Sequence, residues 1–344
     1  MLVVSGARFA DHLTPPGHPE SPERADVLEA VAARARARGA EVTAPRAATR
    51  EELLRVHTAP HVDAIEATRG HALMIDADTF TSPDSADVAL LAAGAAVQAV
   101  EAVLVPGERP HRAAVALVRP PGHHAESRRA MGFCFYNNVA VAAAHARARG
   151  VARVAVLDYD VHHGNGTQEM FYADSSVLYV STHQFPFYPG TGAATETGEK
   201  EGRGFTVNLP IEAGATDGDY VRVFELGVLP VLEEFGPGLL LISAGFDAHE
   251  LDPLAQMRMT SAGFAWVTSA LREMADRVCD GRVVLVTEGG YALSALGESL
   301  DLALTALAGD ATVHAPAAMR PPTGRGDRSL AALAAAQAGR WHGL

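Results

Sequence analysis

The stretch that decides the fold lies near the middle of the chain, where residues 151–166 read VARVAVLDYDVHHGNG. Its first half, from Val151 to Leu157, follows Gly150 and is a predominantly apolar run. Such runs are typical of strands that are buried on both faces of a parallel sheet. Polar side chains begin abruptly at Asp158, which marks the carboxyl end of the predicted strand. The stretch therefore predicts a parallel α/β sheet with a polar edge.

Outward from this stretch, apolar segments alternate with amphipathic ones along most of the chain. Strands are predicted near 113–118, 151–157, 177–182, 205–209, 238–244 and 282–287. Helices are predicted near 22–38, 50–65, 85–104, 137–149, 217–235, 261–279 and 294–308, the first of them capped by Ser21. Apolar strands that alternate with helices predict a parallel, doubly wound sheet.

Composition narrows the classes of protein that the chain could belong to. Its 344 residues are 48% hydrophobic, which is enough for a sizeable core. The formal net charge of −13 gives no support for direct binding to nucleic-acid phosphates. The two cysteines, Cys134 and Cys279, form no C-x-x-C pair, so we expect neither a thiolate zinc site nor a disulfide framework. A reducing, cytoplasmic location is expected.

We expect no membrane segment. The most apolar helix candidate, 88–105, is interrupted by Gly94, Gln98 and Glu101, which favours a helix buried in a core. Residues 1–6 lack the basic region and long apolar stretch of a signal peptide.

Polar clusters follow the predicted strands at their carboxyl ends. The clusters are Arg119–His124, Asp158–His162, Ser181–His183, Ala244–His249 and Thr287–Tyr291. In open α/β sheets, ligands bind at that edge. We therefore expect these five clusters to converge on one site.

Asp158, Asp160 and His162 would point the same way if the chain stays extended after the strand. Two carboxylates and an imidazole resist burial together unless a cation lies between them. Oxygen and nitrogen donors without thiolate fit a catalytic zinc with one open position. The sequence therefore predicts a metal site here.

A third protein ligand is expected from the segment that follows the strand near 238–244. Asp247 lies closest to the end of that strand and would complete a set with Asp160 and His162. Asp252 and His249 remain alternatives to Asp247 as the ligand.

Three more side chains have the chemistry that hydrolysis requires. A water activated by a metal needs a base, and the pair His123 and His124 after Pro-Pro-Gly is suited to that task. Two adjacent histidines should have different pKa values and different roles. Tyr291, after two glycines, could donate a hydrogen bond to a developing oxyanion.

Aromatic residues near the predicted site could form an apolar channel. Phe133 precedes the helix predicted near 137–149, and Phe187 and Tyr188 follow the strand near 177–182. Phe133 together with Phe187 or Tyr188 could form the walls of a narrow channel that leads to the metal.

Several motifs resemble those of the histone deacetylase and acetylpolyamine amidohydrolase superfamily, on the side of its class II and bacterial members. They are His18–Arg24, Arg119–Ala125, Gly132–Asn138, Asp158–Gln168, Ser243–His249 with Asp252–Leu254, and Glu288–Tyr291. The resemblance implies an arginase-like, three-layer α/β/α fold. We expect one catalytic domain over residues 1–310 and a surface extension over 311–344, with a short helix near 328–338.

The resemblance also implies roles for individual residues. One catalytic zinc would be held by Asp160, His162 and Asp247. His124 resembles the general base that later protonates the leaving amine, and His123 resembles its electrostatic partner.

Further roles follow from the same motifs. Asp158 and Asn165 resemble the residues that orient His123 and His124, and Tyr291 resembles the tyrosine that polarises the substrate carbonyl. A structural potassium ion is implied near Asp158, Asp160, His162 and Ser181.

The resemblance places Gly132, Phe133, Tyr188 and Leu254 along the substrate channel. Tyr188 stands where a Phe is usual in the family, and Asn165 replaces the aspartate of class I members. Leu254 stands where polyamine specialists carry an acidic residue, which favours acyl-lysine over a polyamine as the substrate.

The expected function is zinc-dependent removal of an acetyl or similar acyl group from an amine such as acyl-lysine, with release of acetate. An acetylpolyamine or small acetylated metabolite is the alternative substrate. A binuclear manganese ureohydrolase is disfavoured, because Gly164 stands where those enzymes carry a bridging carboxylate. A non-catalytic acyl-lysine binder is disfavoured by the complete set of ligands, base and tyrosine. Self-association into a homo-oligomer is left open.

Overall fold

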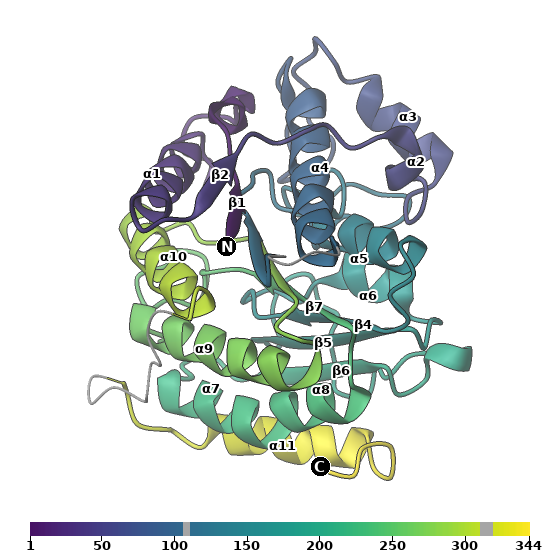
Figure 1. Cartoon of the computed structure of the whole chain (residues 1–344), viewed down its shortest axis with the longest axis vertical. Coiled ribbons are helices and arrows are strands. Elements are labelled where there is room, and N and C mark those ends of the chain that lie inside the picture. The colour runs from purple at the N-terminus through teal and green to yellow at the C-terminus, as the bar shows by residue number, and fades with distance from the viewer. Residues whose placement is uncertain (106–110, 310–318) are drawn as a thin grey trace.

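The computed structural model describes residues 1–105, 111–309 and 319–344 (Figure 1). The strands of this part of the chain form one eight-stranded sheet, in the order β2-β1-β3-β8-β7-β4-β5-β6, and every pairing in it is parallel. The strands are β1 (Leu2–Val4), β2 (Glu41–Thr43), β3 (Ala113–Ala116), β4 (Val154–Asp158), β5 (Val177–Gln184), β6 (Thr206–Ile211), β7 (Leu239–Ala244) and β8 (Val283–Thr287).

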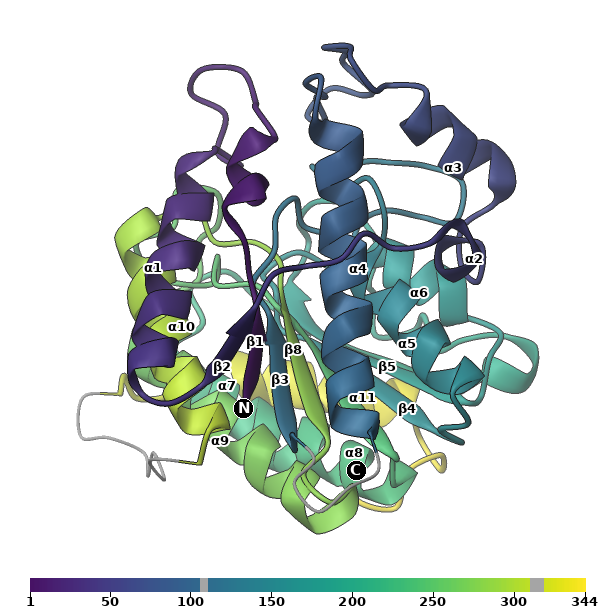
Figure 2. The same ribbon diagram turned by 45° about the horizontal axis from the view of Figure 1, so that its top comes forward.

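Helices cover both faces of this sheet (Figures 1 and 2). The α-helices are α1 (Glu23–Ala37), α2 (Arg50–Leu53), α3 (Ala59–Glu66), α4 (Ser85–Leu104), α5 (Asn138–Ala148), α6 (Asn165–Phe171), α7 (Asp217–Val223), α8 (Leu229–Phe235), α9 (Ser261–Val278), α10 (Leu293–Leu307) and α11 (Arg325–Ala336). Helices α1, α7, α8, α9 and α10 pack on one face, and α4, α5 and α6 pack on the other. The predicted three-layer, doubly wound α/β fold is therefore confirmed.

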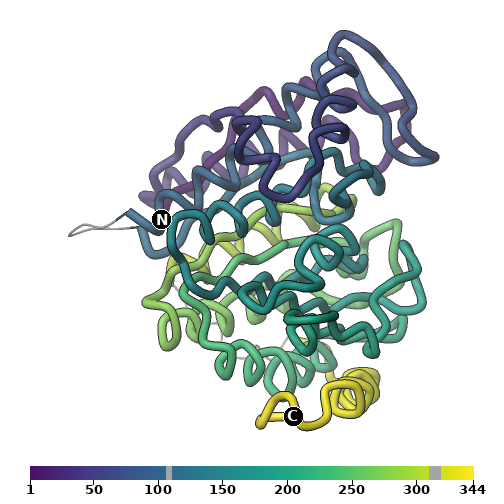
Figure 3. Tube along the Cα trace, turned by 90° about the vertical axis from the view of Figure 1, so that its right-hand side faces the viewer, coloured from purple at the N-terminus to yellow at the C-terminus, as the bar shows by residue number. Residues whose placement is uncertain are grey.

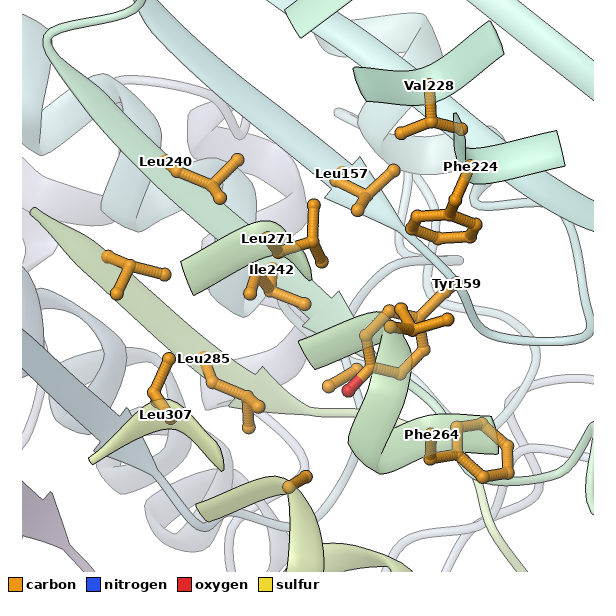
Figure 4. Close-up of a cluster of buried hydrophobic side chains, with 14 of the residues drawn as sticks. Leu157, Tyr159, Phe224, Val228, Leu240, Ile242, Phe264, Leu271, Leu285 and Leu307 are labelled. Atoms are coloured by element: carbon orange, nitrogen blue, oxygen red, sulfur yellow. The ribbon is translucent and has the colours of Figure 1, made fainter. Parts of the chain in front are cut away.

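The core explains why the strands are apolar on both faces. Leu157 of β4 belongs to the cluster under α7 to α10, whereas its neighbour Val156 belongs to the cluster under α4 and α5. Figure 4 shows the first cluster, in which Ile242 of β7 and Leu271 of α9 lie near Leu157. Because consecutive side chains of a strand point to opposite faces, a strand covered on both sides needs apolar residues at every position.

Most predicted elements are present, but several details differ. The six predicted strands agree with β3 to β8 to within three residues at each end. Strands β1 and β2 were not predicted, because each has only three residues and shows no readable periodicity. Helix α6 was also missed. The predicted cap is wrong: the Ser21 side chain makes no capping hydrogen bond, and its carbonyl oxygen accepts from Arg24 N instead.

Two predicted helices are interrupted. The segment 50–65 forms α2 and α3, because the chain leaves the helix after Leu53 and restarts at Thr58 with Pro60 in the first turn. The segment 217–235 contains a π-helical turn at Phe224–Val228 between α7 and α8. Pro230 lies two residues after this turn, in the first turn of α8. Proline lacks an N–H and cannot continue a regular α-helical hydrogen-bond ladder, and the π turn accommodates this break.

Helix α4 is long and apolar enough to cross a membrane by length and composition. An apolar 18-residue stretch of this helix is 61% buried. The helix packs against β1, β3 and α5 inside the fold. The apolarity of α4 is therefore accounted for by core packing, which is the interpretation made from the sequence.

The C-terminal segment lies at one end of the molecule, where Figure 3 shows it in yellow. Helix α11 packs on α7 and on the edge strand β6, and it begins three residues earlier than the helix predicted near 328–338. The Gln337 side chain donates a hydrogen bond to Thr206 O of β6, and the Trp341 ring lies 6.0 Å from that of Phe205. The tail thus covers a strand edge; the first part of the predicted extension, 311–318, lies outside the described residues.

Candidate active site

The strand order brings distant segments of the chain to one place. Strands β3, β8, β7 and β4 are neighbours in the sheet, and β5 lies beside β4. Because all of them are parallel, their carboxyl ends meet at one edge, where a pocket of about 220 Å³ lies. The pocket is lined by Asp78, His124, Gly132, Phe133, His162, Phe187, Tyr188, Leu254 and Tyr291.

Three buried side chains form a candidate metal centre beside this pocket. Donor atoms of Asp160, His162 and Asp247 all lie within 4.8 Å of one another. His162 Nδ1 lies 3.1 Å from Asp160 Oδ1 and 3.1 Å from Asp247 Oδ2. Zinc bound tetrahedrally at about 2.0–2.2 Å puts neighbouring donors roughly 3.3 Å apart. The donor types and their spacing therefore fit a zinc ion.

The electrostatics of this cluster also call for a cation. Burial acts to lower the pKa of His162, but the carboxylates of Asp160 and Asp247 outweigh it and raise that pKa to about 10. Burial and the neighbouring Asp160 raise the pKa of Asp247 to about 7. Two carboxylates buried in one site favour a positive charge between them, and in the protein alone the His162 imidazolium supplies it, with His123 Nε2 3.8 Å from Asp160 Oδ1. A metal ion would replace that proton.

Asp158 does not join this cluster, contrary to the same-face prediction. Strand β4 ends at Asp158, and the chain then turns: Asp158 Oδ1 accepts from Asp160 N, and Asp160 Oδ1 accepts from His162 N. The extended geometry on which the prediction depended is therefore lost. Asp158 Oδ2 instead lies 3.0 Å from His123 Nδ1.

The two alternative ligands also lie outside the cluster. His249 Nδ1 accepts from Leu251 N, and its Nε2 lies 3.3 Å from Ser261 Oγ. Asp252 Oδ2 accepts from the backbone N–H of Tyr291 at 2.7 Å, so this carboxylate holds the tyrosine segment rather than the metal centre.

The histidine pair has two distinct environments. Burial opposes a charge on His123, but the carboxylates of Asp158 and Asp160 raise its pKa to about 10. Burial and the neighbouring charge of His123 lower the pKa of His124 well below its ordinary value. His124 Nδ1 lies 2.8 Å from Asn165 Oδ1, which can only accept, so Nδ1 carries the proton and Nε2 is the basic nitrogen.

Tyr291 completes the polar lining of the pocket. Burial raises the pKa of its hydroxyl well above the ordinary value, so the phenol is neutral and can donate a hydrogen bond. The Arg24 guanidinium lies 5.2 Å from the centre of the Tyr291 ring, and the Phe133 ring packs edge-on against it at 5.8 Å. The backbone of Tyr291 is thus held by Asp252, and its ring is held by Arg24 and Phe133.

The walls of the pocket are aromatic on two sides. Phe187 stacks on His162 at 5.2 Å, and the Tyr188 ring packs edge-on against His124 at 5.1 Å, so both residues of that pair contribute rather than one of them. Gly132 and Phe133 also line the pocket, and both have positive φ angles, of 57° and 69°.

A glycine is required at position 132. A Cβ atom there would lie 2.5 Å from His124 Cδ2. Asp78 Oδ1 accepts from Gly132 N, and Thr79 Oγ1 accepts from Phe133 N, so the loop that carries Asp78 and Thr79 holds this strained backbone.

A buried charge network behind the pocket was not predicted. Arg119 donates from Nε and Nη2 to both carboxylate oxygens of Glu20, at 2.8 and 2.7 Å, and Arg24 Nη1 donates to Glu20 at 2.9 Å. All three side chains are fully buried. The i, i+4 spacing of Glu20 and Arg24 predicts an ion pair, but no sequence pattern reveals that Arg119 lies beside them.

Comparison with known proteins agrees with this geometry. Residues 18–307 match the family model described as "Histone deacetylase domain". The chain is 40% identical over 294 residues to a probable deacetylase of Archaeoglobus fulgidus, which covers 85% of this chain and 81% of that protein. It is 44% identical over 288 residues to a histone deacetylase-like amidohydrolase of Pseudomonas aeruginosa, which covers 80% and 73% of the two chains.

Two further comparisons extend this result. The human polyamine deacetylase HDAC10 is 40% identical over 340 residues, which span 94% of this chain but 50% of that protein. The crystal structure of the HDA15 HD domain superposes with a TM-score of 0.90 and 37% identity, and the match covers 99% of this chain and 96% of that one. The sequence motifs, the parallel sheet and these relatives agree, and the chain belongs to the histone deacetylase family.

Proposed function

We propose that the protein is a zinc-dependent amidohydrolase that removes an acetyl or similar acyl group from an amine such as acyl-lysine and releases acetate. The observation that carries this proposal is the cluster of Asp160, His162 and Asp247 beside a narrow pocket that His124 and Tyr291 also line. A ligand set, a base and a hydrogen-bond donor thus face one small volume, which is what hydrolysis of an unactivated amide requires.

Each residue has a task that its surroundings support. When bound, the zinc ion acts as a Lewis acid on the acyl oxygen and lowers the pKa of a water to about 7. His124 Nε2 accepts the proton of the attacking water and later gives it to the departing amine, while Asn165 holds Nδ1–H. The Tyr291 hydroxyl donates a hydrogen bond to the developing oxyanion. His123, paired with Asp158, supplies positive charge next to the base.

A single metal per chain is favoured over a binuclear site. A Cβ atom at Gly164 would lie 2.3 Å from Asp158 Oδ2 and 2.7 Å from the Tyr179 hydroxyl. No side chain fits there, so position 164 cannot supply a carboxylate to a second metal. We also propose a structural potassium ion near Asp158, Asp160, His162 and Ser181, in keeping with the full burial of the oxygen-bearing side chains of Asp158, Asp160 and Ser181.

Acyl-lysine is favoured over an acetylated polyamine as the substrate. Leu254 lines the pocket with an apolar side chain, which offers nothing to a second ammonium group. Asp78 is the acidic residue among the lining side chains, and its pKa is raised by burial and by the neighbouring Asp76. An alternative remains the polyamine activity named for the human relative.

The test combines metal analysis with turnover. Zinc-loaded protein should contain one zinc per chain and should cleave an acetyl-lysine peptide with a higher kcat/KM than N-acetylspermidine. Asp160→Asn should lose both the metal and the activity. Two metals per chain would overturn the mononuclear proposal, a preference for acetylspermidine would overturn the substrate assignment, and a zinc-loaded protein inert on every acylated amine would overturn the hydrolase itself.

A further inference from the structure

Glu288 is a buried carboxylate that the chemistry above does not use. It directly follows β8, is fully buried and does not line the pocket. Its Oε2 accepts hydrogen bonds from the backbone N–H groups of Gly122 and His123, at 2.6 and 3.1 Å. Its Oε1 accepts from Ser243 Oγ at 2.8 Å. The side chain therefore bridges β7, β8 and the loop that carries the histidine pair.

Glu288 is itself held rigidly. Its backbone N–H donates to Ala244 O of β7, and its carbonyl oxygen accepts from Arg24 Nη2 at 2.5 Å. Arg24 Nε donates to Gly290 O at 2.9 Å. Because the backbone at Glu288 is fixed in this way, its carboxylate has a fixed position. The position of the histidine loop therefore depends on the carboxylate, and not the reverse.

The histidine loop depends on this contact from one side. On the other side, His123 O accepts from Gly166 N at 3.1 Å, and Asn138 lies so close to Gly122 that a Cβ atom there would be 2.4 Å from its nitrogen. The N–H groups of Gly122 and His123 are buried, and buried N–H groups need an acceptor. Glu288 supplies that acceptor to both groups.

We propose that Glu288 is a positioning residue, which sets the register of the His123–His124 loop, and hence of the base, through the hydrogen bonds that its carboxylate accepts rather than through its charge. This role rests on the proposed hydrolase function, because it matters for catalysis only if His124 is the base. The same four-residue segment carries Glu288, Gly289, whose N–H donates to Asp160 Oδ2 at 2.9 Å, and Tyr291. One segment thus contacts the base loop and a metal ligand and itself carries the oxyanion donor.

Two substitutions at position 288 separate the effect of side-chain length from the effect of its negative charge. Glu288→Gln removes the charge but keeps the reach: the amide oxygen can accept from both backbone N–H groups, and the amide N–H can donate to Ser243 Oγ. Glu288→Asp keeps the charge but is one methylene shorter, so it cannot reach both N–H groups. A positioning role predicts that E288Q retains kcat, whereas E288D loses about 10²-fold in kcat with little change in KM, because a misplacement of about 1 Å suffices for such a loss.

Asp219→Asn is the control, because Asp219 is also a buried carboxylate that accepts from backbone N–H groups, those of Thr216, Thr323 and Gly326. It lies away from the pocket, so D219N should lower stability but leave kcat per folded molecule unchanged. The proposal is overturned if folded E288D has the kcat of the wild type, or if E288Q loses as much activity as E288D.

A measurement that does not depend on turnover distinguishes the positioning role of Glu288 from the proposed hydrolase function. In the metal-free protein, the imidazole ¹⁵N resonances of His123 and His124 should shift in E288D and stay in place in E288Q. Unshifted resonances in E288D would overturn the positioning role even in an active enzyme. Shifted resonances in a protein without any amidohydrolase activity would support the positioning of the loop while refuting the proposed function.

Discussion

At the scale of single residues, the site is organised by a few buried charges, each matched to a partner. Asp158 faces His123, and Asp160 and Asp247 face His162. An unpaired charge in such a place would cost several kcal/mol, so each carboxylate must find an imidazole, a backbone N–H or a metal ion. His124 is left as the neutral histidine of the site, because burial and the charge of His123 lower its pKa and its partner Asn165 carries no charge to offset them.

Tyr291 offers a direct test of oxyanion stabilisation. Tyr291→Phe should lower kcat on the order of 10²–10³-fold, since the hydroxyl donates only to charge that develops in the transition state. Bound zinc, measured by metal analysis, should stay at the wild-type level, because Tyr291 is not among the clustered metal donors. A Y291F variant with unimpaired turnover would remove this role.

At the scale of elements, the site depends on contacts that tie the first hundred residues to the sheet. His57 lies between α2 and α3; its Nε2 accepts from Asn137 N at the start of α5, and its Nδ1 donates to Glu126 O. The turn that carries Glu20 is joined to the end of β3 through Arg119 and to α1 through Arg24. Both contacts hold loops that border the pocket.

His57 should contribute to acid denaturation. Burial, with a smaller effect of His61, lowers the pKa of His57 from 6.5 to about 3. The unfolded chain binds a proton at His57 below pH 6.5 and the folded protein does not, so stability falls as the pH drops from 6.5 towards 3, by up to about 1.4 kcal/mol per pH unit. His57→Gln keeps a donor and an acceptor without titrating, and should flatten this dependence in urea unfolding followed across the window.

The exposed His71 is the control for this experiment. His71→Gln should leave the pH dependence of the unfolding free energy as it is in the wild type. An equally steep acid limb in H57Q and in the wild type would show that other groups govern acid denaturation.

Glu20 should be critical for stability. Glu20→Gln leaves the guanidinium groups of Arg24 and Arg119 buried with their charge no longer compensated. Removal of one partner from a buried ion pair costs about 3–5 kcal/mol, and we expect a loss of that size in the unfolding free energy measured with urea. The exposed neighbour Glu23 provides the comparison: a loss in E20Q no larger than that in E23Q would contradict a structural role of the network.

At the scale of the whole molecule, the two edges of the sheet are protected in different ways. Strand β2 ends one side with only three residues, whereas the other side ends in the longer β6, on which α11 packs. An exposed strand edge is a template for aggregation, and both a short edge strand and a covering helix reduce that hazard.

Removal of residues 319–344 should therefore expose β6. We expect a lower Tm and faster aggregation on heating, followed by light scattering, while the site at the centre of the sheet keeps its metal ligands. Gln337→Ala removes a single hydrogen bond to Thr206 and should have a much smaller effect. A truncated chain as stable and as soluble as the full one would show that the tail does not protect this edge.

Much of the fold and of the site could be predicted from local patterns. The apolar run before Asp158 and its counterparts near 238–244 and 282–287 are readable because every position of a doubly covered strand is apolar. The short strands at 2–4 and 41–43 were missed, since three residues carry too little pattern. The resemblance of the motifs to a known family identified the residues that the structure brings to the pocket, but their roles stay predictions until they are tested.

The sequence by itself determined which segments become strands and that polar side chains stand at their carboxyl ends. Only the tertiary structure decided which of those side chains meet: that Asp247 rather than Asp252 faces His162, that Asp158 stays out of the metal cluster, and that Glu288 accepts from the histidine loop. The physical reason is the order of the sheet, in which β7 and β8 insert between β3 and β4. Periodicity reports on neighbours along the chain, whereas these partners are brought together by strand pairing across more than eighty residues.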